Sequence, residues 1–199
     1  MSLHITGDAP ADALLTESPL ALLIGMLLDQ QVAMEAAFTG PRKILERTGT
    51  MNAVTLAGAD ADALVEVFRQ TPAVHRFPGS MAARVQALCR ALVDDWDGDA
   101  AALWTRPDAA VGDRPEGAEG PDGATVLKRL KALPGFGDQK ARIFLALLGK
   151  QYGFTGTGWR PASAPYGEEG SFRSVADIVS PESLALVREH KRAMKKAGA

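Results

Sequence analysis

The chain has 199 residues, of which 46% are hydrophobic and 23% charged, and its formal net charge is −2. This length can bury a sizeable core as one domain or two small lobes, and no run approaches the ~20 apolar residues of a membrane-spanning helix. One cysteine excludes an internal disulfide and an all-cysteine metal site, and the three histidines lack the spacing of metal ligands.

The first predicted helix begins at the Ser-Pro pair 18–19, an N-cap followed by proline at the first helical position. Residues 20–28 are apolar on nearly every face, as in a helix that is buried on all sides. The polar sequence Asp-Gln-Gln at 29–31 interrupts this run. We expect the helix to continue to the Gly-Pro pair 40–41, and a short second helix to close at Gly49.

Two further helices are predicted in the middle of the chain. Residues 59–70 begin with a capping aspartate and repeat apolar side chains on one face. Residues 77–96 repeat apolar side chains at helical spacing, and Cys89 lies beside that stripe. We therefore interpret Cys89 as a small core residue rather than a nucleophile. The stretch 111–123, rich in glycine, proline and acids, is predicted to be a loop without an assigned function.

A glycine turn, Leu-Pro-Gly-Phe-Gly at 133–137, separates two predicted helices at 124–133 and 138–149. Glycines let another chain approach the backbone closely. The second helix then presents unpaired N–H groups and a positive dipole end, which can bind phosphate without any side chain. The turn therefore predicts a DNA-binding helix–hairpin–helix; the alternative is an αα-hairpin that merely packs.

Positive charge is concentrated around this turn. Residues 126–150 hold six basic residues and one acid, a net charge of +5, and residues 181–199 carry +3. By contrast, residues 1–125 carry −9 and residues 151–180 carry −1. Such a distribution is typical of a surface that binds a polyanion, although two solvated helix faces would give the same counts.

The end of the chain is predicted to be helical as well. Ser174 and Asp177 have the spacing of a capping box, and the Ser-Pro pair 180–181 opens a final helix. The residues expected on its inner face are Leu184, Val187 and Met194, with Arg188, Arg192 and Lys195 outward. Because no stretch alternates in the manner of a strand, the fold class is predicted to be all-α.

Three segments resemble the helix–hairpin–helix DNA glycosylases of base excision repair, the endonuclease-III-like or HhH-GPD superfamily. Residues 133–141 are a close variant of the family's Leu-Pro-Gly-x-Gly hairpin. Residues 22–38 are similar to its buried helix that ends in a glutamine which wedges into DNA. Residues 77–92 are similar to its helix upstream of the hairpin. The three occur in the family's order and cover most of 18–153.

The resemblance implies a two-lobed helical fold in which residues 1–199 form a single HhH-GPD unit. One lobe is expected from about 30–125 and the other from the N-terminal segment plus 126–199, with the helix–hairpin–helix at 125–149. Double-stranded, damaged DNA would be held between the lobes of a monomer.

By the same resemblance, Gln31 takes the wedge position, with Gln30 beside it. Extruding a base leaves a hole in the duplex, which a planar amide can fill. A helix that simply reaches the surface would also place polar residues here. The residues predicted to contact DNA are Gln30, Gln31, Leu133, Gly135, Gly137, Lys140 and Arg142.

The chain departs from the family at the expected catalytic positions. The family's aspartate, which would stabilise positive charge on the sugar, falls near Gly156 and Thr157, where no acid exists. Gln139 occupies the slot of the lysine that forms a Schiff base in bifunctional members, and Lys140 is displaced by one residue, about 100° around a helix. The catalytic residue therefore stays unassigned. The candidate acids are Glu168, Glu169, Asp177, Asp29 and Glu35, of which Asp177 is equally explained by the capping box.

The leading interpretation is a monofunctional DNA glycosylase that hydrolyses the N-glycosidic bond of a damaged base. The alternatives are a catalytically inactive DNA-binding or lesion-sensing protein of the same fold, and a small helical protein with a purely structural hairpin. We expect no cofactor and no iron–sulfur cluster, since one cysteine cannot supply four ligands. The first residues lack an export signal, so we expect a cytoplasmic protein without a membrane partner.

Overall fold

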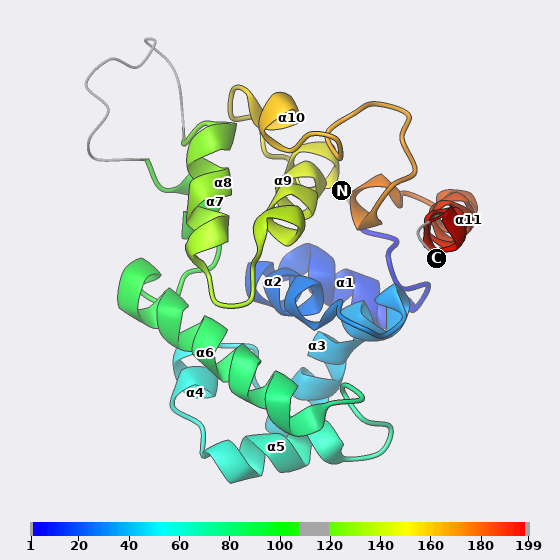
Figure 1. Ribbon diagram of the computed structural model, residues 1–199. Helices are drawn as coiled ribbons and strands as arrows, with labels where there is room; N and C mark the ends of the chain where they lie inside the picture. Colours follow the sequence, from blue (N-terminus) through cyan, green and yellow to red (C-terminus); the bar gives the residue numbers. More distant parts are fainter. Residues whose placement is uncertain (1, 108–119, 198–199) are drawn as a thin grey trace. The chain divides into compact units, whose positions relative to one another are not determined.

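The computed structural model describes residues 2–107 and 120–197, which form eleven α-helices, one 3-10 helix and no strand. The all-α prediction is confirmed (Figure 1). In chain order the elements are α1 (Ala9–Glu17), α2 (Pro19–Leu28), α3 (Met34–Thr48), α4 (Ala53–Ala57), α5 (Ala61–Arg69), α6 (Pro78–Trp96), α7 (Ala102–Thr105), α8 (Gly123–Ala132), α9 (Asp138–Gln151), α10 (Trp159–Ala162), η1 (Val175–Asp177) and α11 (Pro181–Ala197). Most of the loop expected at 111–123 lies outside the described residues.

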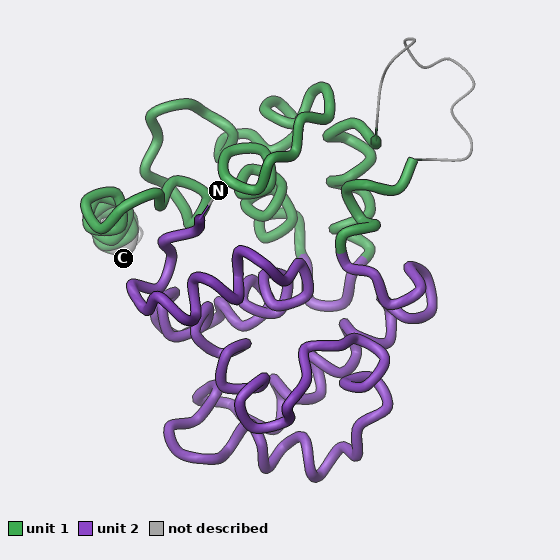
Figure 2. The backbone as a smooth tube through the Cα atoms, turned by 180° about the vertical axis from the view of Figure 1, so that it is seen from behind, with its two compact units in different colours: residues 1, 101–132, 137–199 green, residues 2–100, 133–136 purple. Residues whose placement is uncertain are grey.

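The chain divides into two compact units, coloured separately in Figure 2. Unit 1 contains residues 101–132 and 137–199, and unit 2 contains residues 2–100 together with 133–136. Residues 133–136 of the glycine turn are therefore grouped with unit 2, whereas Gly137 and the helices before and after the turn are grouped with unit 1. The lobes expected from the family resemblance divide the chain differently and stay a prediction.

Unit 2 is built around α2, whose residues are buried from Leu20 to Leu28. Ser18 caps this helix as predicted, because its Oγ accepts the N–H of Ala21 at 3.2 Å. The helices α1 and α3 pack against α2, while α4 and α5 pack against α6. Within the described residues no single helix is long and apolar enough to span a membrane; α1 and α2 pass that test only as a pair bent by 117°.

Two predictions about the early helices are wrong. The helix predicted to begin at residues 18–19, which is α2, ends at Leu28 instead of continuing to the Gly-Pro pair 40–41. The next helix, α3, begins only at Met34. The Gly-Pro pair at 40–41 does not end a helix, because both residues lie buried inside α3. A Cβ on Gly40 would lie 2.6 Å from Leu28 Cδ1. The glycine thus permits close helix packing rather than marking a boundary.

Unit 1 is built around α8 and α9, which pack against each other, with α10 against both and η1 against α9. The prediction that α9 stops at Gly149 is wrong, since the helix continues to Gln151. A Cβ on Gly149 would lie 2.4 Å from the Trp159 ring, so this glycine also serves packing. The predicted capping box of Ser174 and Asp177 is confirmed at η1.

Candidate nucleic-acid interface

The glycine turn is a four-residue β-turn. The N–H of Phe136 donates to the carbonyl oxygen of Leu133 at 3.1 Å, with Pro134 and Gly135 between them. Gly135 has φ +81°, so the turn has the type II pattern of proline second and glycine third. A Cβ on Gly135 would also lie 2.4 Å from Leu27 Cδ1. Both the dihedral angle and the close approach require glycine here.

The side chains of the turn alternate between buried and exposed positions. Leu133 and Phe136 are only 5% and 3% exposed and anchor the turn, whereas Pro134, Gly135 and Gly137 are exposed. The main chain is therefore open to solvent at Gly135 and Gly137, and not at Leu133 or Phe136. The structure therefore leaves little of Leu133, a residue predicted to contact DNA, exposed to a ligand.

The start of α9 has open hydrogen-bond donors. Gly137 is its N-cap, with φ −70° and ψ 171°, and no side chain caps the helix. The N–H groups of Gly137, Asp138 and Gln139 donate to no acceptor among residues 2–107 and 120–197. A Cβ on Gly137 would meet nothing within 4 Å. Side chains do cap α1, α2, α4 and α5. The start of α9 thus offers an anion the donors and the space that it needs.

Charged side chains surround this helix start. Asp138 accepts hydrogen bonds from Arg142 Nε at 2.7 Å and from Lys131 Nζ at 2.8 Å, and these lower its pKa to about 2. Arg142 also donates to the carbonyl oxygen of Ala162 at 2.9 Å. This predicted DNA-binding residue therefore also ties α9 to the end of α10. Lys140, half-buried in the first turn, adds a further positive charge.

The two predicted wedge glutamines differ in their surroundings. The Gln30 amide donates to the carbonyl oxygen of Leu27 at 2.7 Å and accepts from Arg84 Nη1 at 2.6 Å. Gln31 is exposed and has φ +56°, a left-handed conformation that is uncommon for a residue other than glycine. Such backbone conformations are concentrated at functional sites. Gln30 is thus fixed in place, and Gln31 is the glutamine that projects outward.

Residues 75–77 support these glutamines and were missed by the sequence analysis. His75 is 3% exposed, and its Nδ1 accepts the N–H of Phe77 at 3.1 Å. Its Nε2 must therefore carry the proton that it donates to the carbonyl oxygen of Gln30 at 3.0 Å. Arg76 Nη1 lies 3.4 Å from the carbonyl oxygen of Gln31.

Phe77 and Arg76 form an exposed pair beside this contact. The Arg76 guanidinium lies 4.7 Å from the centroid of the Phe77 ring, and Phe77 is 39% exposed. An arginine stacked on an open aromatic ring presents positive charge and a flat apolar face together. The signal in the sequence was the Arg-Phe pair directly before a proline at a helix start.

A family model described as HhH-GPD superfamily base excision DNA repair protein matches residues 24–156. The chain belongs to the HhH-GPD superfamily. The match includes the glutamines, the glycine turn and all of α9. It confirms the resemblance found in the sequence and implies DNA binding and base excision DNA repair. Neither a curated protein nor a solved structure matches the chain.

This HhH-GPD protein uses Asp177 as a structural group. Its carboxylate accepts from Lys150 Nζ at 2.5 Å, from Ser171 Oγ at 3.0 Å, and from the N–H groups of Arg173 and Ser174 at 2.8 and 3.0 Å. The Asp177 side chain is only 2% exposed. All four donors come from unit 1, so the capping and ion-pair role accounts for this acid fully.

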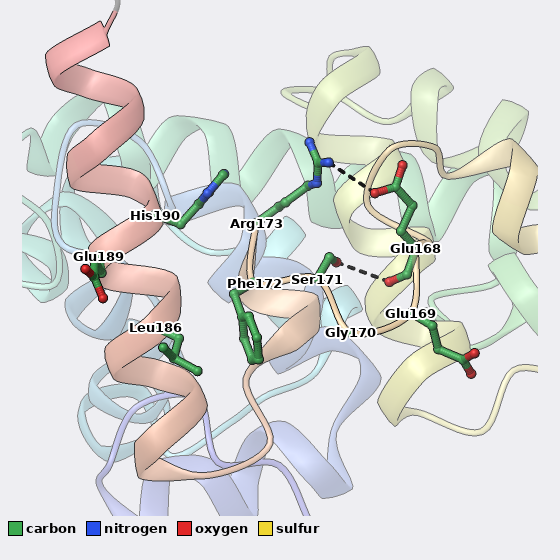
Figure 3. Close-up of a pocket in the computed structure, with 9 residues that line it drawn as sticks. All are labelled: Glu168, Glu169, Gly170, Ser171, Phe172, Arg173, Leu186, Glu189 and His190. Carbon is green, nitrogen blue, oxygen red and sulfur yellow. Dashed lines mark hydrogen bonds and ion pairs between the residues drawn. The ribbon is translucent and has the colours of Figure 1, made fainter.

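Two other candidate acids line an open hollow of about 550 Å³ between residues 168–173 and α11 (Figure 3). Glu168 pairs with Arg173, and Glu169 pairs with Arg160, each at 3.1 Å. In Figure 3 the Glu169 carboxylate points away from α11. Both acids are solvent-exposed ion-pair partners in this structure.

Asp29 is the half-buried C-cap of α2, and Glu35 is half-buried in the first turn of α3. Gln139, in the slot of the Schiff-base lysine, donates its amide N–H to Tyr166 Oη at 3.0 Å. At the aspartate position, the Thr157 carbonyl oxygen accepts the N–H of Gly123 at 2.8 Å. Neither Gly156 nor Thr157 carries a carboxylate.

Proposed function

We propose that this HhH-GPD protein is a monofunctional DNA glycosylase that hydrolyses the N-glycosidic bond of a damaged base in duplex DNA. We further propose that it acts as a monomer in the cytoplasm. The observation that carries the proposal is the exposed glycine turn leading into an uncapped helix start, in a chain of a base excision repair family.

The first step of the proposed reaction is phosphate binding at the start of α9. The open N–H groups of Gly137, Asp138 and Gln139 would donate to phosphate oxygens, and the helix dipole favours the negative charge. Contacts of this kind position a protein on DNA without reading its sequence. The Asp138 carboxylate is held by Arg142 and Lys131, so the group as a whole stays positive.

The second step is extrusion of the target nucleotide, which requires that the vacated space be filled. Gln31 is exposed, and the main chain around it is held by His75, Arg76 and the fixed amide of Gln30. This support would present the Gln31 side chain to the duplex from a main chain that is already held in place. Gln31 is therefore the proposed wedge, and Gln30 its support.

The third step breaks the bond between the base and C1′ of the sugar, and water adds to C1′. Gln139 stands where bifunctional relatives carry an amine, and an amide cannot form a Schiff base. Water is then the nucleophile, which makes the proposed activity monofunctional. The proposal assigns the supporting carboxylate to no residue, because each of the five candidate acids already interacts with another group.

A second candidate function is DNA binding or lesion sensing without catalysis. It is favoured by one observation, namely that no acid occupies the aspartate position near Gly156 and Thr157. Both functions predict binding to DNA, and only the first predicts release of a base.

The deciding experiment uses duplexes that each carry one alkylated, deaminated or oxidised base. Abasic sites are scored as strand cleavage after heat or alkali. We expect cleavage of at least one duplex after alkali and none before it. At DNA concentrations below the dissociation constant, the Gly137→Pro variant, purified in the same way, should release base at least roughly tenfold more slowly, whereas a contaminating glycosylase would act at the same rate in both preparations.

Two results would contradict the glycosylase proposal in different ways. If no base is released while the chain still binds DNA, the lesion-sensing function replaces it. If strands are cleaved without alkali, the enzyme has a lyase step and is not monofunctional.

A further inference from the structure

The helix α11 is packed at its start and unpacked along its second half. Ser183 Oγ accepts the N–H groups of Val179 and Ser180 at 2.8 and 2.9 Å, and Leu184 and Val187 are buried. Beyond Val187 the pattern changes. The described side chains that are exposed there are Arg188, Glu189, Lys191, Arg192, Ala193, Met194 and Lys196.

This second half is strongly basic on one side. From their spacing, Arg188, Lys191, Arg192 and Lys196 fall within an arc of about 140° on the helix. Lys191, Arg192 and Lys196 form no hydrogen bond or ion pair with the described part of the chain. We call residues 188–196 the basic arm.

The arm extends well beyond the packed part of its own helix. Nine residues of α-helix span about 13 Å. Within unit 1, α11 packs against η1, which in turn packs against α9. Figure 1 shows η1 between α9 and α11, so the arm is separate from the start of α9.

The composition of the arm favours a polyanion over a lipid surface. A membrane-surface helix needs a broad face of large apolar residues, whereas Met194 is the one large apolar residue from 188 to 196. The partly exposed Leu186 and Phe172 line the hollow of Figure 3, to which the arm contributes only the polar residues Glu189 and His190. DNA, which members of this family bind, has the complementary charge.

We propose that the basic arm is a second phosphate-binding surface, which contacts the backbone of duplex DNA independently of sequence and away from the target base. The proposal rests on the DNA binding proposed above. Each phosphate contact would release a condensed counterion, so the arm should be visible in the salt dependence of binding.

The test measures the dissociation constant of the full chain for an undamaged duplex over a range of KCl concentrations. The triple variant Lys191→Gln, Arg192→Gln, Lys196→Gln replaces three charged side chains with glutamine, which is neutral and a good helix former. Each phosphate contact contributes roughly 0.9 to the magnitude of the slope of log K against log[salt]. We therefore expect the slope of the variant to be shallower by about 2–3. The matched control, Lys191→Arg, Arg192→Lys, Lys196→Arg, keeps every charge and should keep the slope.

The outcomes separate this inference from the proposed function. If the unaltered protein binds DNA but the glutamine variant has the same salt slope, the proposal for the basic arm is wrong and the proposed function stands. If the unaltered protein shows no salt-dependent binding to DNA, both proposals are wrong. If the glutamine variant keeps its DNA slope but loses binding to phosphatidylserine vesicles, the arm is a lipid contact and the inference is wrong.

Discussion

Asp138 places a carboxylate at the helix start where phosphate is proposed to bind. Its hydrogen bonds from Arg142 and Lys131 lower its pKa to about 2, so it stays ionised at any pH relevant to DNA binding. An acid in the first turn suits the helix dipole, yet it repels an incoming phosphate. The residue therefore favours the free helix at the expense of DNA affinity.

We predict that Asp138→Asn binds duplex DNA more tightly than the unaltered chain. The change removes one negative charge and leaves Lys131 and Arg142 available to phosphate. The salt slope should steepen by about one contact. Fluorescence anisotropy at several salt concentrations measures both quantities, and weaker binding by a folded variant would argue against phosphate at this position.

His75 makes the support of the glutamines sensitive to pH. Burial lowers the pKa of His75, and nearby Arg76 and Arg84 lower it further. Below about pH 6.5 the unfolded chain therefore binds a proton that the folded protein resists. Its contribution to stability is complete above that pH and is lost as pH falls toward the folded-state pKa.

We predict that the free energy of unfolding decreases between pH 7 and pH 5, and that His75→Gln reduces this decrease. Glutamine keeps one donor and one acceptor but does not titrate. Urea unfolding at several pH values compares the two proteins, which share all other titrating groups. Identical pH dependence in both would show that His75 does not carry the effect.

At the scale of elements, two glycines of one hairpin have different roles. Gly135 is required by its φ of +81° and by its closeness to Leu27, whereas Gly137 has an ordinary φ and open space in front of it. The fold therefore explains why residue 135 is a glycine but does not explain why residue 137 is one. Close approach of another molecule to the main chain at Gly137 would explain it.

We predict opposite effects on stability for the two alanine variants. Gly137→Ala should leave stability unchanged or raise it by about 0.4–1 kcal/mol, yet weaken DNA binding because its methyl group enters the phosphate site. Gly135→Ala should lose more than about 1 kcal/mol, since an L-residue is strained at this φ. Thermal unfolding and DNA titration of both variants test this; unimpaired DNA binding by Gly137→Ala would contradict it.

The Lys150–Asp177 pair joins α9 to η1 inside unit 1. Both side chains are largely buried, at 13% and 2% exposure. We predict that Asp177→Asn lowers the free energy of unfolding by about 3–5 kcal/mol, because it leaves a lysine charge without its partner. The salt slope of DNA binding should not change. A variant of normal stability that has lost base release would instead make Asp177 catalytic.

The local signals in the sequence predicted three capped helix starts, but missed the starts of α1 and α3 and two helix ends. Ser18, Asp60 and Ser174 cap helices as expected, because a cap depends on residues within three positions. Gly40 and Gly149 were interpreted as boundaries, yet both lie within helices because distant side chains pack against them. Met194 was expected on the inner face of the last helix and is 60% exposed, because helical spacing alone does not show where a helix extends beyond the core.

Only part of the candidate site could be predicted, because sequence patterns reveal local motifs but not contacts between distant residues. The glycine turn and Gln31 are encoded in contiguous motifs and could be found from sequence alone. The His75 support depends on hydrogen bonds across 45 positions of the chain, which no local pattern reveals. The sequence has no acid at the family's aspartate position near Gly156 and Thr157.

At the scale of the whole molecule, the proposed phosphate-binding surfaces and the proposed wedge belong to different units. The proposed phosphate contacts, the start of α9 and the basic arm, belong to unit 1. The proposed wedge Gln31, with its support at residues 75–77, belongs to unit 2. Residues 1–125, which include residues 101–125 of unit 1, carry a net charge of −9, so DNA would be attracted chiefly through the basic segments 126–150 and 181–199.

The most direct test of the central claim is DNA binding by Gly137→Pro. Proline suits the φ of −70° and removes an N–H that donates to nothing in the described structure, so the variant should fold. A hydrogen bond to a charged group contributes about 1.5–3 kcal/mol, and we therefore predict a dissociation constant raised at least roughly tenfold. An unchanged dissociation constant in a variant with normal unfolding would show that the main chain at this turn does not hold DNA.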